Sequence, residues 1–418
     1  MHILLPTDVF PPRCGGAGWS SHALARALIA QGHGVAAIVP KLDAPGETHE
    51  DVLGVPTVRF GYRAPNIPFL KNYFRHEQLW QHYAQVITDA AAHVQSPVVI
   101  HAQHVQSAPA AVLAGQRIGA PVVVTVRDHW PWDYFATGLH GNRLPYPGQT
   151  AASLATDLVA REGPLRGALA LVAIPYMLAH LRRRQHYLRQ ADAVIAVSSY
   201  IAERLSAVVP VERIHVIPNM VDVESIARVT STPQQSVQGP YTLFVGKLDR
   251  NKGADVLVEV FRELRQNNSS AVNTVPQLVF AGDGPLKPYL ETELAALGVQ
   301  TRFLEWTEHD EVLRLIAGCE LLLFPSTWGE PLSRVWLEAA ACGAPMLAMP
   351  TGGVHDIIEN NVNGVLAATP ALFARRMLAL LADLPLRERL GAAIQATARA
   401  RFSVPHVIGQ IEGLYRVL

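Results

Sequence analysis

The chain has 418 residues, and its basic and acidic side chains balance to a formal net charge of zero. This length allows two or three domains, and the neutral balance argues against nucleic acid as a partner, because nucleic-acid-binding domains are normally strongly basic. The cysteines, Cys14, Cys319 and Cys342, are few, odd in number and without metal-ligand spacing, so we expect a reducing cytoplasm and no disulfide framework.

The hydropathy pattern predicts neither a signal peptide nor a membrane-spanning helix. The chain opens directly on a strand-like run at residues 2–5, so we expect no signal peptide. We find no apolar stretch of the roughly 18 to 20 residues that a spanning helix needs. The sequence therefore predicts a protein that folds around its own apolar core.

The first elements of the chain read as half of a mononucleotide-binding fold. Residues 2–6 predict a strand, and a turn-rich loop containing Gly15 and Gly16 leads into a helix expected over about 20–31. A second strand is expected over 35–39. This order is typical of Rossmann-like domains. The loop lacks the G-x-G-x-x-G spacing, so an ordinary strand-to-helix turn is the alternative.

Polar side chains follow two further predicted strands. The strand over 98–101 ends in His101, and the strand over 122–126 is followed by Arg127, Asp128 and His129. Because α/β folds bind ligands past the carboxyl ends of parallel strands, we expect these residues to line a cleft. Asp128 and His129 are both suited to orient or deprotonate a hydroxyl group, and the sequence does not choose between them.

Residues 150–190 predict two helices, over 151–161 and 167–189, with Pro175 as a kink in the second. The second helix is apolar over 167–181 and then carries Arg182, Arg183 and Arg184. We favour a buried helix whose C-terminus is solvated by arginines. The alternative is a face that lies on an anionic membrane surface, with apolar residues below and basic residues at the lipid headgroups.

The second half of the chain begins after a polar linker at 231–240. A strand over 241–245 precedes a loop that contains Lys247 and Lys252, and a basic loop before a helix N-terminus suits a diphosphate. The loop does not have P-loop spacing. Two other strand ends, one followed by Gly282 and Asp283 and one followed by Trp306, are expected to line the same cleft.

The stretch 324–353 places two carboxylates along one helix. A strand over 321–324 leads into a loop with Glu330, and Pro331 fits the first turn of a helix from about 332 to 341 that ends at Gly343. Glu330 therefore stands at a helix N-terminus, which favours anionic ligands, and Glu338 lies about two turns on. Carboxylates accept hydrogen bonds from sugar hydroxyls, although two solvent-exposed glutamates are the alternative.

These residues carry a family resemblance. The run from Glu330-Pro331 through Glu338-Ala339 to Gly352-Gly353 resembles the E-x7-E signature of the retaining glycosyltransferases of family 4. The loop GKLDRNKG at 246–253 resembles that family's donor-phosphate motif, with Lys247 in place of the usual arginine. The resemblance covers nearly the whole chain and is densest over 241–364. Leu332-Ser333 departs from the family's Phe-Gly.

The resemblance implies an α/β protein of the GT-B fold, with two Rossmann-like domains whose parallel sheets face each other across a cleft. The expected divisions are an N-terminal acceptor-side domain over 1–225, a linker over 226–240, a nucleotide-sugar-binding domain over 241–398 and a helix over 399–418 that crosses back to the first domain. It also implies transfer of a sugar from a UDP- or GDP-sugar to an acceptor hydroxyl with retention of configuration, in glycan, glycolipid or polysaccharide synthesis.

The resemblance implies a role for each candidate residue. Glu330 would contact the donor sugar, Glu338 the ribose, and Lys247 and Lys252 the diphosphate. Asp128 or His129 would handle the acceptor. The remaining donor-side positions are the loop glycines Gly15 and Gly16, the base-flanking Gly282, Asp283 and Trp306, and Leu332 and Ser333, where the family presents backbone amides to the sugar.

The expected partners are a nucleotide-sugar donor and a sugar, lipid-linked or small-molecule acceptor, with peripheral contact at the inner face of a membrane as an open alternative. The chain has no Asp-x-Asp pair, so we expect neither a metal ion nor another cofactor. Two other functions fit the same residues: a sugar-nucleotide epimerase or hydrolase, which needs no acceptor, and a non-catalytic sugar-nucleotide-binding protein.

Overall fold

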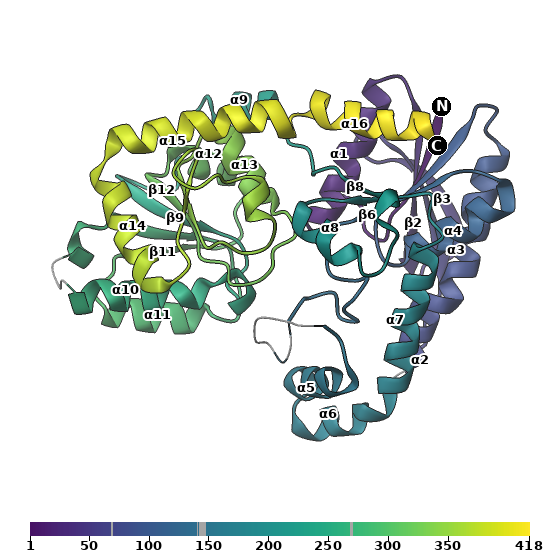
Figure 1. Cartoon of the computed structure of the whole chain (residues 1–418), viewed down its shortest axis with the longest axis horizontal. Helices are drawn as coiled ribbons and strands as arrows, with labels where there is room; N and C mark the ends of the chain where they lie inside the picture. Colours follow the sequence, from purple (N-terminus) through teal and green to yellow (C-terminus); the bar gives the residue numbers. More distant parts are fainter. Residues whose placement is uncertain (68–69, 140, 142–147, 268–270) are drawn as a thin grey trace. The chain divides into compact units, whose positions relative to one another are not determined.

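The computed structural model describes residues 1–67, 70–139, 141, 148–267 and 271–418 (Figure 1). These residues form two compact units. Unit 1 comprises the described residues of 1–141 and 146–220 together with 407–418, and unit 2 comprises 221–406. The boundary therefore falls at 220, because helix α9 (Val223–Thr230) packs on α12 and α13 of unit 2 instead of belonging to the first unit or to a linker.

Unit 1 is built on an eight-stranded sheet of order β3-β4-β2-β1-β5-β6-β7-β8. Its strands are β1 (His2–Pro6), β2 (Gly34–Leu42), β3 (Glu47–Asp51), β4 (Pro56–Tyr62), β5 (Val98–Ala102), β6 (Val122–Val126), β7 (Ala193–Ala196) and β8 (Ile214–Val216). All neighbours pair in parallel except β3 and β4. The antiparallel edge strand β3 has only exposed polar side chains, which disfavours pairing with a further strand.

The helices of unit 1 connect these strands. They are α1 (Gly16–Ala30), α2 (Leu70–Tyr73), the π-helical turn η1 (Phe74–Gln78), α3 (Leu79–Ala92), α4 (Ser107–Ile118), α5 (Ala151–Glu162), α6 (Pro164–Ala170), the 3-10 turn η2 (Leu171–Ala173), α7 (Ile174–Leu188), α8 (Ser199–Leu205), the 3-10 turn η3 (Val211–Arg213) and most of α16 (Val404–Val417). In Figure 1, α5 and α6 lie at the end of α7 that is remote from the sheet of this unit.

Unit 2 has a six-stranded, wholly parallel sheet of order β11-β10-β9-β12-β13-β14. Its strands are β9 (Tyr241–Val245), β10 (Gln277–Ala281), β11 (Thr301–Leu304), β12 (Leu321–Phe324), β13 (Met346–Ala348) and β14 (Val365–Leu366). Its helices are α9, η4 (Arg250–Lys252), α10 (Ala254–Asn267), η5 (Ala271–Thr274), α11 (Lys287–Ala296), α12 (His309–Gly318), α13 (Arg334–Cys342), η6 (Gly352–Asp356), α14 (Pro370–Ala382), α15 (Leu384–Thr397) and η7 (Ala398–Phe402).

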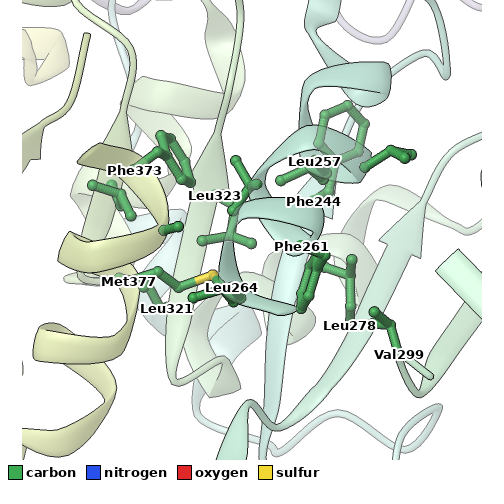
Figure 2. Packing of buried hydrophobic residues seen from close by; sticks show 14 of the residues in the cluster. Phe244, Leu257, Phe261, Leu264, Leu278, Val299, Leu321, Leu323, Phe373 and Met377 are labelled. Atoms are coloured by element: carbon green, nitrogen blue, oxygen red, sulfur yellow. The ribbon is translucent and has the colours of Figure 1, made fainter. Parts of the chain in front are cut away.

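The core of unit 2 lies between its sheet and the helices that cover it (Figure 2). Phe261 from α10 and Phe373 from α14 are buried in the same cluster as Leu321 and Leu323 of β12. Strand β12 is apolar on both faces, as expected for a parallel sheet covered on both sides by helices. The burial fixes the strand ends, and with them the loops that carry the polar candidates.

Each sheet contains a point at which the strand order reverses. In unit 1 this point lies between β1 and β5, and in unit 2 it lies between β9 and β12. Loops at the carboxyl ends of such strand pairs diverge to opposite faces and leave a crevice for a ligand. The prediction of two Rossmann-like units with parallel sheets is confirmed.

Two local predictions are wrong. Helix α13 begins at Arg334 with Ser333 as its N-cap, so Pro331 lies before the helix and not in its first turn. The predicted single helix over 167–189 is divided into α6 and α7 by the 3-10 turn η2. Pro175 occupies the first turn of α7, where its missing N–H leaves no helical hydrogen bond unmade, and so it starts a helix where a kink was expected.

Candidate active site

The reversal point of unit 2 brings together the two residues that the sequence assigned to phosphate and to sugar. Lys252 ends the turn η4 after β9, and Glu330 lies in the loop after β12. Lys252 Nζ is 2.5 Å from Glu330 Oε2 and 5.2 Å from the centre of the Trp328 ring. A cation and a carboxylate thus meet at the carboxyl ends of the two central strands.

Backbone contacts fix Glu330. Its N–H donates to the Trp328 carbonyl (2.7 Å), and its own carbonyl accepts from the N–H of Gly353 (2.8 Å). Gly352 has a φ of +58°, and a side chain there would come within 2.2 Å of the Glu330 carbonyl oxygen. Only glycine fits this position, which explains the first glycine of the Gly-Gly pair in the sequence motif. The buried carboxylate is therefore held in one place.

The N-terminus of α13 begins four residues after Glu330. Leu332 and Ser333 are buried, and the Ser333 hydroxyl makes no capping hydrogen bond to the helix. The first N–H groups of a helix have no partners within it and carry a partial positive charge. The start of α13 can therefore offer backbone N–H groups to an anion, as the sequence predicted for the neighbourhood of Leu332 and Ser333.

Glu338 lies on α13 and is held by two basic side chains. His309 Nε2 is 2.9 Å from Glu338 Oε1, and the Arg334 guanidinium is 3.0 Å from the same oxygen. Burial alone would favour the neutral acid, but the His309 hydrogen bond and the Arg334 charge lower the pKa of Glu338. Among the described residues Oε2 accepts no hydrogen bond, so one oxygen of an ionised carboxylate remains for a ligand.

The other loop candidates in unit 2 have structural roles in addition to any contact with a ligand. Lys247 is exposed, and its Nζ lies 3.0 Å from Asp249. A side chain at Gly282 would come within 2.1 Å of the Gly246 carbonyl, so this glycine allows the loops after β9 and β10 to touch. The Asp283 carboxylate accepts from the N–H of Gly284 (2.8 Å) and stabilises the same turn.

Trp306 is strongly exposed. It follows β11, and 81% of its surface is accessible. It stands three positions before His309, the partner of Glu338. An indole this open to solvent contributes little to the core, so a stacking ligand is the kind of contact that its position allows.

The glycine loop of unit 1 starts α1. Gly15 is the N-cap and Gly16 the first residue of the helix, which therefore begins a turn earlier than predicted. A side chain at Gly15 would meet nothing within 4 Å, whereas one at Gly18 would collide with Cys14. Gly18, and not Gly15, is required for packing, so the open side of this turn is at Gly15.

Asp128 and His129 differ in their surroundings. Asp128 is partly buried and accepts the N–H of Trp130 (2.8 Å). Burial raises the pKa of Asp128 to about 6. His129 is 1% exposed, stacks edge-on against Trp132 and Tyr200, and accepts the Trp132 indole N–H at Nδ1 (3.2 Å). The geometry favours Asp128 for contact with a substrate and gives His129 a place in the core.

Asp8 is a candidate that the sequence reasoning missed. It follows β1, and its carboxylate accepts the N–H groups of Gln106 and Ser107 at the start of α4 (2.8 Å each). Burial and, to a smaller extent, the charge of Asp128 raise the pKa of Asp8 to about 6. The signal was its position two residues past a central strand, next to the reversal point.

Two histidines at the end of β5 are neutral. Burial lowers the pKa of both His101 and His104 to about 3. The ring of His101 is held between Tyr415 and Thr125, whereas the ring of His104 hydrogen-bonds to Thr7 at Nδ1 (2.9 Å). The buried Nε2 of His104 and Oε1 of Gln103 have no hydrogen-bond partner among the described residues. Buried polar atoms without partners are costly, so these two are suited to a ligand.

Other residues that the sequence reasoning left out are Trp328, His309 and Arg334. Arg334 precedes Glu338 by four positions, the spacing of a helical ion pair, and this was the available signal. In the described part of the chain, no group of three or more histidine, cysteine, aspartate or glutamate side chains is placed to hold a metal ion.

Comparison with known proteins shows the family of the chain. The family model Glycosyltransferase Family 4 matches residues 14–225, and the model Glycosyl transferases group 1 matches residues 231–397. The chain belongs to glycosyltransferase family 4. The resemblance that the E-x7-E stretch predicted is confirmed.

Several curated proteins match part of the chain. Alpha-D-kanosaminyltransferase of Streptomyces kanamyceticus is 28% identical over 246 residues, which is 56% of this chain and 62% of that protein. D-inositol 3-phosphate glycosyltransferase of Xylanimonas cellulosilytica is 29% identical over 56% of this chain and 58% of its own length. That of Salinispora arenicola is 35% identical over 37% and 36%. The chain thus matches about a third to three fifths of each of these relatives.

Solved structures match over the full length. HepE of Anabaena, in complex with UDP, aligns with a TM-score of 0.67 at 18% identity, over 100% of both chains. Sucrose-phosphate synthase from Thermosynechococcus elongatus aligns with a TM-score of 0.69 at 20% identity, over 99% of this chain and 98% of that one. At this identity the likeness establishes the fold, which is GT-B.

Proposed function

We propose that this family 4 protein transfers a sugar from a nucleoside diphosphate sugar to an acceptor hydroxyl group, with retention of configuration at the anomeric carbon. The observation that supports the proposal most is the contact of Lys252 with Glu330 at 2.5 Å. It puts a cation for a diphosphate beside a carboxylate for sugar hydroxyls, at the strand reversal where α/β sheets bind ligands.

On the donor side, each charged residue has one task. Lys252 and the N-terminus of α13 stabilise the negative charge that develops on the leaving diphosphate. Glu330 accepts hydrogen bonds from the donor sugar. Glu338, kept ionised by His309 and Arg334, accepts from the ribose through Oε2. We assign Lys247 to the diphosphate as well, with a smaller share because it is exposed and pairs with Asp249.

On the acceptor side, Asp128 orients the attacking hydroxyl group. We propose a same-face displacement, because we assign no side chain as a covalent nucleophile. The bond between the anomeric carbon and the leaving phosphate oxygen breaks as the acceptor oxygen bonds to that carbon from the same face. The acceptor proton passes to the leaving phosphate, so the products are a glycoside and a nucleoside diphosphate. No metal ion takes part in this proposal.

UDP is the first nucleotide to test, because HepE, which was solved in complex with UDP, has the same fold. Trp306 offers an exposed face on which a base can stack. None of the described cysteines forms a disulfide, which fits a reducing compartment, and we propose the cytoplasm.

The test begins with a thermal-shift screen of UDP, GDP and ADP and their sugars. We expect one base to raise the melting temperature of the protein, and its sugar nucleotide to release nucleoside diphosphate when an acceptor is added. NMR of the product should show the anomeric configuration of the donor. Donor consumption without an acceptor would indicate an epimerase or hydrolase, binding without turnover would indicate a binding protein, and no shift with any nucleotide would contradict the proposal.

A further inference from the structure

Helix α6 exposes an apolar stripe that a soluble helix would normally turn inward. Leu165, Leu169 and Val172 are 82%, 72% and 77% exposed. Their spacing, i, i+4 and i+7, places them on one face of a helix. Single exposed apolar side chains are ordinary, but a contiguous stripe on a surface marks a contact with another body.

The stripe joins a second apolar group. Leu169 of α6 and Asn72 of α2 line one cavity of about 630 Å³, whose walls are mainly apolar and aromatic. Next to Asn72, Leu70 and Tyr73 are also exposed. The apolar surface of α6 and η2 therefore continues onto α2, and we call this continuous region the α6 face.

The α6 face is bordered by positive charge. Residues 148–190 contain six arginines but only two carboxylates, Asp157 and Glu162, in a chain whose net charge is zero. Asp157 is buried and bonds to the backbone of Gly141, so it does not offset charge at the surface. Arg166 lies between the exposed leucines, and Arg161 lies over the Phe135 ring. Arg161 and Arg166 are the arginines of this stretch that lie on α5 and α6, where the exposed Glu162 offsets one of them, and the other four lie on or after α7.

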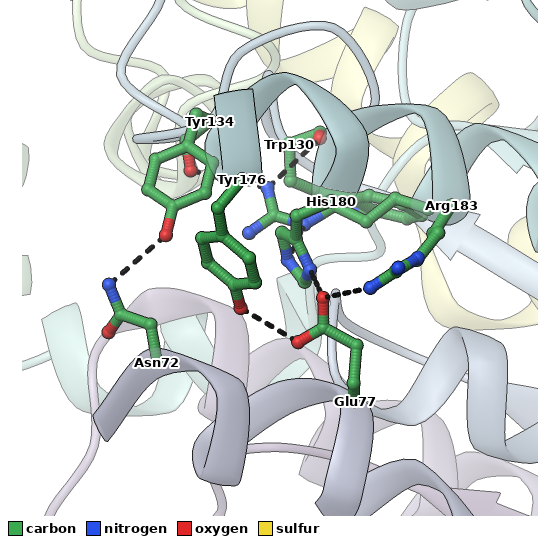
Figure 3. A network of polar contacts seen from close by, with 8 residues as sticks. Asn72, Glu77, Trp130, Tyr134, Tyr176, His180 and Arg183 are labelled. Atoms are coloured by element: carbon green, nitrogen blue, oxygen red, sulfur yellow. Dashed lines mark hydrogen bonds and ion pairs between the residues drawn. The ribbon is translucent and has the colours of Figure 1, made fainter. Parts of the chain in front are cut away.

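A polar network holds the α6 face to the rest of unit 1 (Figure 3). The Glu77 carboxylate of η1 accepts from Tyr176 (2.8 Å), His180 (2.8 Å) and Arg183 (3.1 Å), all on α7. Burial and nearby cations lower the pKa of His180 despite Glu77, so its ring is neutral, donating from Nδ1 and accepting from Arg184 at Nε2. These hydrogen bonds fix α7, and with it the α6 face, to the rest of unit 1.

The helical stretch Pro164–Leu188 is long and apolar enough to cross a membrane by length and composition. However, Arg184 in its second half donates to the backbone carbonyl of Tyr134 (3.2 Å) inside unit 1, so this half cannot leave the protein. Only 28% of the most apolar stretch is buried, which is low for a core helix. The combination fits a helix that lies against a membrane more than one that spans it.

We propose that the α6 face docks on a lipid bilayer that contains anionic lipids. Leu165, Leu169 and Val172 enter the boundary of the acyl chains, and Arg161 and Arg166 contact the phosphates. Charge complementarity selects this occupant, because arginines beside an apolar stripe match an anionic headgroup layer over hydrocarbon. The inference needs no nucleotide and stands apart from the proposed function.

The test is co-sedimentation of the full chain with vesicles of phosphatidylcholine alone and of phosphatidylcholine with phosphatidylglycerol. We expect binding to the second kind only, weakened by salt. The double variant L169D/V172D should bind at least about tenfold more weakly. The matched control is Val211→Asp, an equally open residue of unit 1 outside the α6 face (67% exposed), which should bind like the parent protein.

Melting temperatures show whether each variant is folded. If L169D/V172D does not fold, Arg166→Glu replaces it, since this exposed arginine supports no described core contact, and it should weaken binding to the anionic vesicles. Equal binding by parent and variants would overturn the proposal. So would the absence of vesicle binding together with a dimer, seen by light scattering, that the same substitutions dissociate, because the occupant would then be a second copy of the chain.

Discussion

The two strand reversals of this protein carry opposite kinds of chemistry. In unit 2, Lys252 and Glu330 meet as full charges, and Glu338 is kept ionised by its basic partners. In unit 1, burial lowers the pKa of His104 to about 3 and raises the pKa values of Asp8 and Asp128 to about 6. Unit 1 thus holds neutral histidines and two carboxyl groups that titrate close to neutral pH.

This difference separates the ligands that each reversal suits. A site of fixed charges stabilises a diphosphate and its developing charge. A site of buried groups whose pKa values lie near neutral pH suits an uncharged hydroxyl group. Such a site can orient the hydroxyl group or accept its proton near neutral pH. On the proposed function, unit 2 therefore takes the donor and unit 1 the acceptor. Substitutions in each unit, the dependence on pH and the removal of metal ions test this assignment of donor and acceptor.

The largest effect is expected at Glu330. Glu330→Gln keeps the shape but removes the charge that faces the donor sugar, and we expect kcat to fall roughly 10²- to 10³-fold, as for loss of one preorganised transition-state contact. Free nucleoside diphosphate, measured by calorimetry, should bind no more weakly, because that ligand has no donor sugar and Lys252 loses a competing carboxylate. The surface variant Glu293→Gln is the control. A variant that melts normally and turns over at the parent rate would remove Glu330 from the site.

The next effect is expected at Lys252. Lys252→Ala removes a charge-assisted contact worth about 1.5–3 kcal/mol, which corresponds to a roughly 10- to 100-fold weaker affinity for nucleoside diphosphate. Lys247→Ala is the matched control, since Lys247 is exposed and pairs with Asp249, and its effect should be smaller. Calorimetry measures both affinities. A larger loss for Lys247 would reverse the assignment of the two lysines.

In unit 1 the expected effect is one of pH. Asp128 accepts a strong hydrogen bond from the acceptor hydroxyl group only when it is ionised, so with a pKa of about 6 at Asp128, kcat/KM should rise about tenfold from pH 5 to pH 7. Asp128→Asn should abolish the rise, and Asp8→Asn should shift its midpoint downward, because the charge of one carboxylate raises the pKa of the other. A profile unchanged in Asp128→Asn would exclude Asp128 from the reaction.

The same carboxylates make a prediction for stability. Their folded pKa of about 6 lies above the unfolded value, so the folded state binds more protons between about pH 4 and pH 6, and the free energy of unfolding should decrease as pH rises through this range. Denaturant titrations at fixed pH measure this slope. Asp128→Asn should flatten it, whereas a slope of the opposite sign would show that paired carboxylates elsewhere dominate.

The smallest effect is expected from metal removal. Because lysine and helix N–H groups supply the positive charge in the proposed mechanism, exhaustive chelation should leave the transfer rate unchanged. The rate is measured with and without added magnesium or manganese. Activity that disappears with chelator and returns with either ion would show that the charge balance at the donor diphosphate needs a cation from outside the chain.

Much of unit 2 was predictable because its chemistry is written in charged residues at fixed spacing. The strands β9 and β12 have the predicted bounds, and Lys252 and Glu330 lie in the segments that follow them, as expected. The pairing of these two side chains was not predictable, since it depends on a contact across two strand ends. The start of α13 was placed too early because Pro331 is equally suited to the loop before a helix.

Unit 1 was less accessible to prediction for a physical reason. The properties of Asp8 and His104 come from desolvation and not from residue type, and no local pattern reports how deeply a strand end will be buried. His129 and Asp128 looked equivalent in the sequence and separated only when aromatic side chains enclosed the histidine. The break at η2 was likewise hidden, because an apolar run reads the same with or without it.

The contact between Lys252 and Glu330 also has a consequence for selectivity. An incoming phosphate must compete with an internal carboxylate for the same ammonium group. Inorganic phosphate brings only its charge to that competition, whereas a nucleotide sugar also brings hydroxyl groups that satisfy Glu330 and Glu338. On the proposed function, the pair would therefore disfavour fragments of the donor and admit most readily the ligand that replaces every interaction it displaces.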